Sequence, residues 1–128
     1  MNIGQAAKMS GVSPKLIRHY ESTGIIPKAA RSVSGYRVYS DVDVHILKFV
    51  KHARGLGFSM PAIKKLVGLW RNRSRASAEV KELALYHITQ LEQKIAELDS
   101  MAKALRQLAR SCRGDSRPEC PILDELAR

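Results

Sequence analysis

The feature that most constrains the fold of this chain is an apolar repeat between Ser77 and Cys112. Its members recur at alternating steps of four and three residues: Ala84, Ile88, Leu91, Ile95, Leu98, Ala102, Leu105 and Ala109. This spacing places every member on one side of a helix and is typical of a coiled-coil seam. Continuing the seven-residue step puts Ser77 at one end of the stripe and Cys112 at the other. Taken alone, the pattern also fits a packing helix that ends in a buried cysteine.

The length and apolar content bound the number of domains. A chain of 128 residues with 45% hydrophobic residues can form one modest domain with an extension, or a small domain that shares its core with a second copy. No run has the apolar length of a membrane span, and the first residues lack the layout of a signal peptide. We therefore expect a cytoplasmic protein with no membrane partner. In that reducing compartment, two cysteines indicate a metal or redox site rather than a structural disulfide.

Positive charge is concentrated in the first part of the chain. Up to Arg75 there are 14 Lys and Arg residues against 3 acidic ones, whereas the remainder has 8 basic and 9 acidic residues. A surface so basic binds polyanions, and the usual polyanion is nucleic acid. The alternative is a solvated basic face that only maintains solubility.

Two short helices are predicted at the start of the chain. Apolar spacing predicts one over residues 3–9, which Gly11 breaks. Ser13 and Pro14 begin the next as its N-cap and first helical residue, and Gly24 ends it. The inward side of the second helix is expected to carry Leu16, Ile17 and Tyr20. Two short helices around a glycine turn form a helix-turn-helix pattern.

The remaining elements are a wing and further helices. Residues 25–39 contain β-branched and aromatic residues around Gly35 and predict a short two-stranded wing. Ser40 caps a third helix that runs to about residue 56, and a fourth covers residues 59–70. The seam helix follows from about residue 76 to Cys112, then a loop to Cys120 and one or two final helical turns. The fold class is mostly α.

Basic and aromatic side chains are interleaved on the second helix and the wing. The candidates are Lys15, Arg18 and His19 on the helix, with Arg31, Tyr36, Arg37 and Tyr39 in the wing. Arginine and lysine neutralise phosphates, and tyrosine hydroxyls can hydrogen-bond to phosphate oxygens. Packing within the wing is the alternative role for the two tyrosines.

Five stretches together resemble one known family. They are Met1-Asn-Ile-Gly-Gln-Ala-Ala7, Ile17-Arg-His-Tyr-Glu21, Gly24-Ile-Ile-Pro27, Gly35-Tyr-Arg-Val-Tyr39 and Ala53-Arg-Gly-Leu-Gly-Phe58. They look like the winged-helix DNA-binding domain of the MerR family of bacterial regulators, and the resemblance covers the whole chain. It implies four regions: 1–57 for DNA binding, 58–75 as a connector, 76–110 as an antiparallel coiled-coil dimerisation helix, and 111–128 as a metal-binding loop with a short terminal helix.

The resemblance also implies partners and a mode of regulation. It implies that a homodimer contacts double-stranded promoter DNA through Lys15, Arg18, Tyr20, Arg31, Tyr36, Arg37 and Arg54. Family members bind promoters whose spacer is too long for RNA polymerase, and they bend and untwist that DNA when the effector binds. Such deformation costs on the order of several kcal/mol. The effector then needs only to shift the dimer between two states.

Cys112 and Cys120 are the candidate metal ligands. Seven residues separate them without a His or Met, so two thiolates are the only soft ligands. Zinc would have to recruit Asp115 or Glu119 to complete its coordination. Two thiolates suit a soft monovalent d¹⁰ ion, Cu(I) first, with Ag(I) and Au(I) as chemical cousins. Cys120 precedes Pro121 at the start of the terminal helix, where the helix dipole should lower the pKa of its thiol.

Ser77 is the expected neighbour of this metal site, across the dimer. If two seam helices pair antiparallel with Ser77 opposite Cys112, the centre of the pair falls beside Ile95, in the middle of the apolar stripe. A bis-thiolate with a monovalent ion has one net negative charge, which a neutral serine tolerates, whereas a divalent ion favours another anionic ligand. The divalent-metal branch of the family has a cysteine at this position. Ser77 therefore makes the chain similar to the copper-efflux regulator branch.

Several alternatives stay open. Arg113 stands where that branch often has proline, and Pro118 resembles the gold-responsive members, so an Au(I) sensor competes with a Cu(I) sensor. A thiol sensor would use a reversible disulfide between Cys112 and Cys120. A thiol enzyme is disfavoured because no histidine base lies near either cysteine in the sequence, and we expect no enzymatic activity. An architectural DNA-binding protein without an effector is the last alternative.

Overall fold

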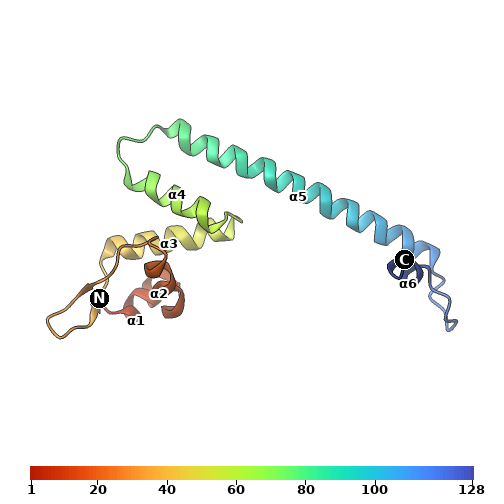
Figure 1. The fold of residues 1–128 in the computed structure, drawn as a ribbon, viewed down its shortest axis with the longest axis horizontal. Coiled ribbons are helices and arrows are strands. Elements are labelled where there is room, and N and C mark those ends of the chain that lie inside the picture. Colours follow the sequence, from red (N-terminus) through yellow and green to blue (C-terminus); the bar gives the residue numbers. More distant parts are fainter. The chain divides into compact units, whose positions relative to one another are not determined.

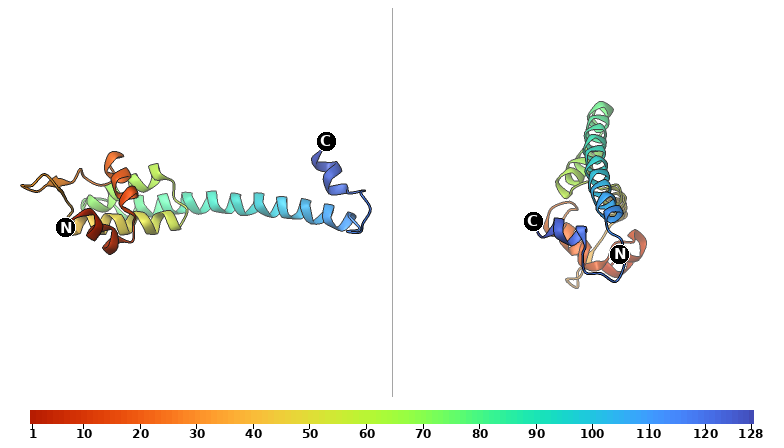
Figure 2. Two further views of the ribbon diagram at one scale, coloured as in Figure 1. Left: turned by 90° about the horizontal axis from the view of Figure 1, so that it is seen from below. Right: turned by 90° about the vertical axis from the view of Figure 1, so that its right-hand side faces the viewer.

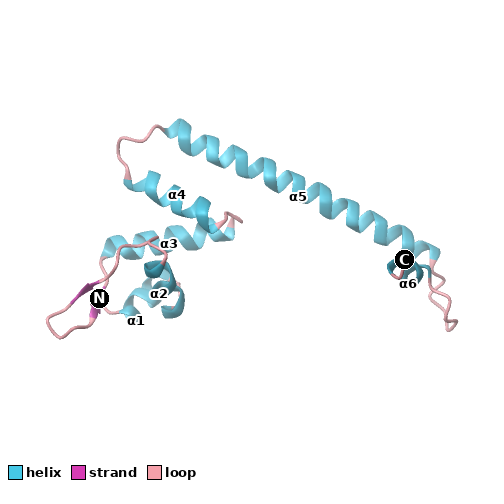
Figure 3. Ribbon diagram, viewed as in Figure 1, coloured by secondary structure: helices cyan, strands magenta, loops and turns pink.

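A computed structural model describes all residues from Met1 to Arg128. Its elements in chain order are α1 (Ile3–Ser10), α2 (Pro14–Ser22), β1 (Ala30–Arg31), β2 (Arg37–Val38), α3 (Asp41–Gly55), α4 (Met60–Arg71), α5 (Ser77–Ser111) and α6 (Pro121–Leu126) (Figure 1). Helices dominate, and the two short strands are the only sheet (Figure 3). The chain divides into two compact units, residues 1–80 and 81–128, which are described separately.

Side-chain caps define where the helices of the first unit begin. The Asn2 side chain accepts a hydrogen bond from the Gln5 N–H at 2.8 Å, and the Gln5 side chain accepts one from the Asn2 N–H at 2.9 Å. Ser40 and Asp43 form the same reciprocal box at the start of α3. Each pairing satisfies backbone donors that a helix terminus leaves without partners. Ser13, the predicted cap of α2, accepts a hydrogen bond from the Leu16 N–H.

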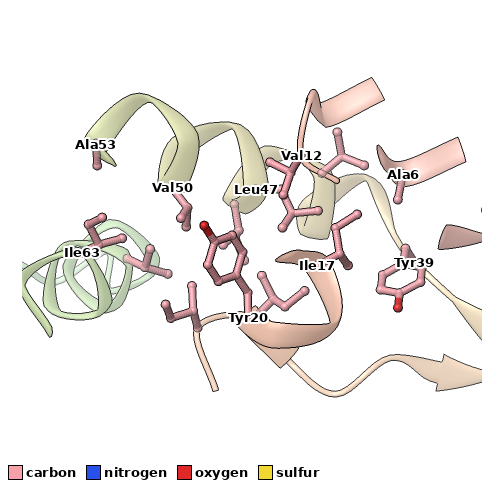
Figure 4. Close-up of a cluster of buried hydrophobic side chains, with 14 residues drawn as sticks. Ala6, Val12, Ile17, Tyr20, Tyr39, Leu47, Val50, Ala53 and Ile63 are labelled. Atoms are coloured by element: carbon pink, nitrogen blue, oxygen red, sulfur yellow. The ribbon is translucent and has the colours of Figure 1, made fainter. Parts of the chain in front are cut away.

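The core of the first unit lies where α1, α2 and α4 pack against α3. Figure 4 shows the Tyr20 ring beside Leu47 and Val50 of α3, with Ile17 between Tyr20 and Tyr39. Ile46, Leu47, Val50 and Ile63 are fully buried, so α3 supplies the centre of this core. Burial of each such side chain contributes about 1.5–3 kcal/mol.

The wing is a two-stranded antiparallel ribbon between α2 and α3. Ala30 pairs with Val38 and Arg31 pairs with Arg37. The strands are shorter than the sequence pattern suggested, because residues 32–36 form the connecting turn. Within that turn the Gly35 N–H donates to the Ser32 carbonyl, and Gly35 has a φ of +83°, which favours glycine.

The long seam helix is present as one continuous α5 of 35 residues (Figure 2). At a rise of 1.5 Å per residue, a straight helix of this many residues is about 50 Å long. None of its residues is buried in the single chain. No helix of the structure, α5 included, is both long enough and apolar enough for a membrane span. The prediction of a mostly α fold, with a winged helix-turn-helix ahead of a long helix, is confirmed.

Candidate DNA-binding surface and metal site

One side of α2 is basic and exposed while the other is buried. Lys15, Arg18 and His19 are exposed, whereas Ile17 and Tyr20 lie in the core. The 3.6-residue period of the helix separates the two sets. Helix α2 therefore packs against the core through its apolar side, and its basic side is exposed to solvent.

A groove lies between α2 and the wing. It has a volume of about 700 Å³, and its wall includes Arg18 of α2 together with Arg31, Tyr36 and Arg37 of the wing. The structure thus brings together four of the seven residues predicted to contact DNA. Lys15 is exposed on α2 but does not line the groove.

The turn of the wing orients its functional side chains. The Arg31 guanidinium donates to the Gly35 carbonyl at 2.9 Å, which ties the first strand to the turn. The Ser32 hydroxyl accepts a hydrogen bond from the Tyr36 N–H at 3.2 Å. The Tyr36 side chain is left 75% exposed. An exposed tyrosine between two arginines can donate its hydroxyl hydrogen to a phosphate oxygen.

Tyr20 corrects one expectation. Only 2% of this residue is exposed, so its side chain has no surface for a direct contact with DNA. Its hydroxyl instead accepts a hydrogen bond at 2.8 Å from the guanidinium of Arg54, an exposed residue near the end of α3. The role of Tyr20 is therefore to hold Arg54, which stays a candidate for phosphate contact.

Glu21 is a functional candidate that the sequence interpretation left without a role. Its carboxylate accepts hydrogen bonds from the Ala29 N–H and the Tyr39 hydroxyl, and it lies 3.8 Å from the Arg37 guanidinium. A signal was present, since Glu21 is one of only three acids in the first 75 residues. The other two, Asp41 and Asp43, are explained by the first turn of α3.

The two cysteines are neighbours in the second unit. Cys112 directly follows α5 and Cys120 directly precedes α6, and their sulfurs are 4.0 Å apart as free thiols. Both residues are half-buried. A metal–sulfur bond is about 2.3 Å long for zinc, so one ion of similar size can bind both sulfurs if they are within about 4.6 Å. The loop therefore already holds the thiols at a spacing that one ion can bridge.

The environment of Cys120 favours its thiolate. The backbone amide of Leu123 lowers the pKa of the Cys120 thiol, and the Ile122 amide and the Cys112 thiol act in the same direction. The predicted direction of the pKa change is thus the one found. The thiol makes no full capping hydrogen bond, so the effect comes from nearby amides of the first turn of α6.

Asp115, an acid of the loop between the two cysteines, is held by Arg117. Arg117 donates from both Nε and Nη2 to the same oxygen of Asp115, at 2.9 and 2.8 Å, and it holds the pKa of that carboxyl below its usual range. Nowhere in residues 1–128 do three or more His, Cys, Asp or Glu side chains gather as metal ligands. The side chains that the structure brings together at this end of the chain are the two thiols of Cys112 and Cys120.

Ser77 is the first residue of α5 and lies in the first unit. It lines a hollow with Trp70 and the arginines at positions 71, 73 and 75.

Known proteins resemble this chain along almost its whole length. A family model described as "MerR HTH family regulatory protein" matches residues 1–68, and another described as "MerR, DNA binding" matches residues 44–108. The chain is 57% identical to "Heavy metal-dependent transcription regulator 2" of Rhizobium meliloti, over 99% of this chain and 86% of that protein. It is 39% identical to the transcriptional regulator CueR of Salmonella typhimurium, over 99% and 92% of the two chains.

A solved structure extends the similarity to the entire fold. The transcription regulator PbrR691 of Ralstonia metallidurans, in complex with lead(II), matches with a TM-score of 0.87 and 32% identity over 98% of each chain. All these relatives are regulators of transcription, and none is an enzyme. The chain belongs to the MerR family of helix-turn-helix transcriptional regulators.

Proposed function

We propose that this protein is a Cu(I)-responsive regulator that binds promoter DNA as a homodimer and activates metal-efflux or detoxification genes. The observation that carries the proposal is the pair of free thiols of Cys112 and Cys120, 4.0 Å apart. Heavy-metal dependence is in the name of a relative that is 57% identical. The particular ion is inferred from the chemistry of the donors.

Two sulfur ligands favour a monovalent soft ion. Cu(I) accepts low coordination by thiolates, whereas zinc takes four ligands or three with an open position. Asp115, one of the two acids of the loop, would have to leave its two hydrogen bonds with Arg117 to act as a third ligand. Ag(I) and Au(I) share the same preference, so an Au(I)-selective sensor is the alternative within this function.

The dimer is inferred from the stripe on α5. Ile88, Ile95, Leu98 and Leu105 are each about half exposed or more in the single chain. A contiguous apolar stripe of this kind needs a partner, and a second α5 supplies a matching one. Antiparallel pairing about a centre beside Ile95 brings Ser77 of each chain to the Cys112 loop of the other. Each metal site would then lie at the interface between protomers, with Ser77 beside the ligands.

The proposal divides the chain by task. Residues 1–57 bind DNA through Lys15, Arg18, Arg31, Tyr36, Arg37 and Arg54, with residues 58–75 as connector. Residues 76–110 form the dimer, and residues 111–128 bind the ion. Because the site spans the interface, metal binding can change the spacing of the two DNA-binding regions. That change would control bending and untwisting of the promoter, and so the access of RNA polymerase.

The test combines metal titration with a promoter reporter. Cu(I), Ag(I) and Au(I) are each added at matched free concentration, under a competing chelator, to the wild type and to Cys112→Ser, Cys120→Ser and Ser116→Ala. Both cysteine variants should lose the reporter response and keep DNA affinity. Ser116→Ala, a loop variant with both thiols, should respond like the wild type. Loss of DNA binding in the cysteine variants would instead make the cysteines structural.

A thiol-oxidation sensor is the second candidate, because the same 4.0 Å separation needs only a small movement to form a disulfide of about 2.05 Å. Counting free thiols after mild peroxide, alongside the reporter, separates the two functions. If metal failed to bind tightly while oxidation switched the promoter, the oxidation function would replace the metal function.

A further inference from the structure

The carboxylate of Glu21 is the point at which both ends of the wing meet helix α2. At the entrance to the wing, the Ala29 N–H donates to Glu21 Oε2 at 3.2 Å. At its exit, the Tyr39 hydroxyl donates to Glu21 Oε1. Between these ends, the Arg37 guanidinium lies 3.8 Å from the same Oε1. The Glu21 carboxylate thus contacts three residues that are 8 to 18 positions away in the sequence.

This junction is shielded from water. The Glu21 side chain is 7% exposed and Tyr39 is 1% exposed. Hydrogen bonds to a charged group in such surroundings are stronger than those at the surface, and a buried acceptor without donors is costly. The Tyr39 N–H also donates to the Met1 carbonyl at 2.7 Å, so the exit of the wing is fixed by its backbone and its side chain.

The two elements that Glu21 joins both line the basic groove, which is also lined by Asn2 and Ile3 at the start of α1. Arg18 lies three residues before Glu21, one turn back along α2, while Arg31 and Tyr36 reach the groove from the wing. Wing strands of two residues each have little stiffness of their own. The separation between Arg18 and the wing arginines therefore depends on the Glu21 junction.

We propose that Glu21 is a positioning residue for DNA recognition, which fixes the wing against α2 and restrains Arg37 within the groove. The inference rests on the DNA-binding part of the function above and adds a residue that is not itself expected to touch DNA. Glu21 offsets part of the charge of Arg37, which is 40% exposed. Arg37 can then contact a phosphate only in the position that the Glu21 junction gives it. Because part of its charge is offset, Arg37 also attracts DNA of any sequence less strongly.

Two substitutions separate geometry from charge. In Glu21→Gln, the amide oxygen can still accept from the Ala29 N–H, and the amide nitrogen can donate to the Tyr39 hydroxyl oxygen. The junction is kept while its negative charge is lost. In Glu21→Ala both contacts disappear. Glu82→Ala removes an exposed acid from α5 and serves as the control for net charge.

The experiment uses the full-length protein, a duplex selected by the wild type from a random library, and a scrambled duplex. Hydroxyl-radical footprints and salt-dependent affinities are recorded for each variant. Glu21→Ala should lose the flanking protections that the wing provides and keep those from α2. The magnitude of the slope of log K against log salt should also fall by about 1 to 2, since each lost phosphate contact removes about 0.9. Glu21→Gln should keep the footprint and bind scrambled DNA more tightly, with a slope steeper by up to about 1. Glu82→Ala should match the wild type.

The results separate failure of the positioning role of Glu21 from failure of the DNA-binding function. A folded Glu21→Ala variant with the wild-type footprint would overturn the positioning role, as would equal loss of the footprint in Glu21→Ala and Glu21→Gln. If Glu21→Ala does not fold, Tyr39→Phe is used instead, since it removes only the link at the exit of the wing. Tyr39→Phe should show a smaller loss of the same flanking protections, and an unchanged footprint in this variant would overturn the proposal. If the wild type enriched no sequence from the library, the DNA-binding function would fail, and the positioning role with it.

Discussion

At the scale of single residues, Tyr39 combines burial with a carboxylate partner. Burial, followed by the hydrogen bond and the charge of Glu21, raises the pKa of the Tyr39 hydroxyl above its ordinary value of 10.0. The folded state therefore resists ionisation of this group more than the unfolded state does. The resulting stabilisation is fully present below pH 10, and it is lost as the pH rises through the raised pKa of the folded protein.

This linkage predicts the behaviour of Tyr39→Phe. At neutral pH the variant should lose about 1.5–3 kcal/mol of unfolding free energy, because the lost hydrogen bond is made to the charged Glu21 carboxylate. Above pH 10 its stability should fall less steeply than that of the wild type, because the ionisation has been removed. Urea unfolding over a pH series measures both effects. Tyr36→Phe changes an exposed hydroxyl and should follow the wild-type curve; an equally shallow curve for that control would refute the assignment to Tyr39.

Ser77 is the residue that should set the charge of the accepted ion. Ser77→Cys would add a thiolate from one protomer to the two-cysteine loop of the other and complete a three-sulfur site. We expect the affinity for Zn(II) to rise by about tenfold or more, equivalent to about 1.4 kcal/mol. Competition with a zinc chelator measures the change. Ser74→Cys places a thiol before the start of α5 and should give no gain; a similar gain there would show that position 77 has no special role.

What the sequence reveals at this scale depends on how far away the partners of a residue lie. Cys112 and Cys120 were identified because thiols are rare and because the loop between them is short. Tyr20 could be placed on the inward side of α2 from its helical period, but the hydrogen bond to Arg54 joins residues 34 positions apart. Glu21 likewise gains its role from the folded wing, which no local pattern specifies.

At the scale of elements, helix boundaries follow from local chemistry. The caps Ser13 and Ser40 were predicted, and both accept hydrogen bonds from the first turn of their helices, as Ser59 does at the start of α4. Such bonds join residues three apart, so the sequence alone contains the information. The ends of the two wing strands were predicted less accurately. Pairing of Arg31 with Arg37 depends on the turn between them and not on β propensity.

The cap of α3 gives a stability prediction. Ser40→Ala removes the oxygen that accepts the Asp43 N–H and should cost about 1 kcal/mol of unfolding free energy. Asp43 can still accept from the backbone N–H at position 40, so the loss stays near that value. Urea unfolding at fixed protein concentration provides the measurement. Ser100→Ala, in an exposed position of α5, should change stability by less than about 0.5 kcal/mol. Equal losses in both variants would mean that the Ser40 cap contributes nothing.

At the scale of the whole molecule, the long helix α5 has no buried residue in the single chain. The apolar period of α5 could be read directly from the sequence, and the structure contains the helix that it predicts. The apolar period does not specify the direction of a partner helix, because the same stripe could pair with a parallel or an antiparallel helix. The position of Ser77, one helix length away from its own Cys112, is what selects the antiparallel arrangement in our proposal.

The dimer prediction concerns Ile95, which lies beside the expected two-fold axis and is 65% exposed in the single chain. In Ile95→Glu, two carboxylates would meet near the axis in place of two apolar side chains. Loss of about 1.5–3 kcal/mol of burial per side chain, counted twice, corresponds to a dissociation constant raised by roughly 10² to 10⁴. Sedimentation over a concentration series measures this shift. Gln93→Glu adds the same charge two residues away, outside the stripe, and should remain dimeric. In the proposed function the metal site and DNA binding both depend on the dimer, so Ile95→Glu should also lose the reporter response while the first unit stays folded. A dimer as stable as the wild type would remove the α5 stripe from the interface, and Ser77 from the metal site with it.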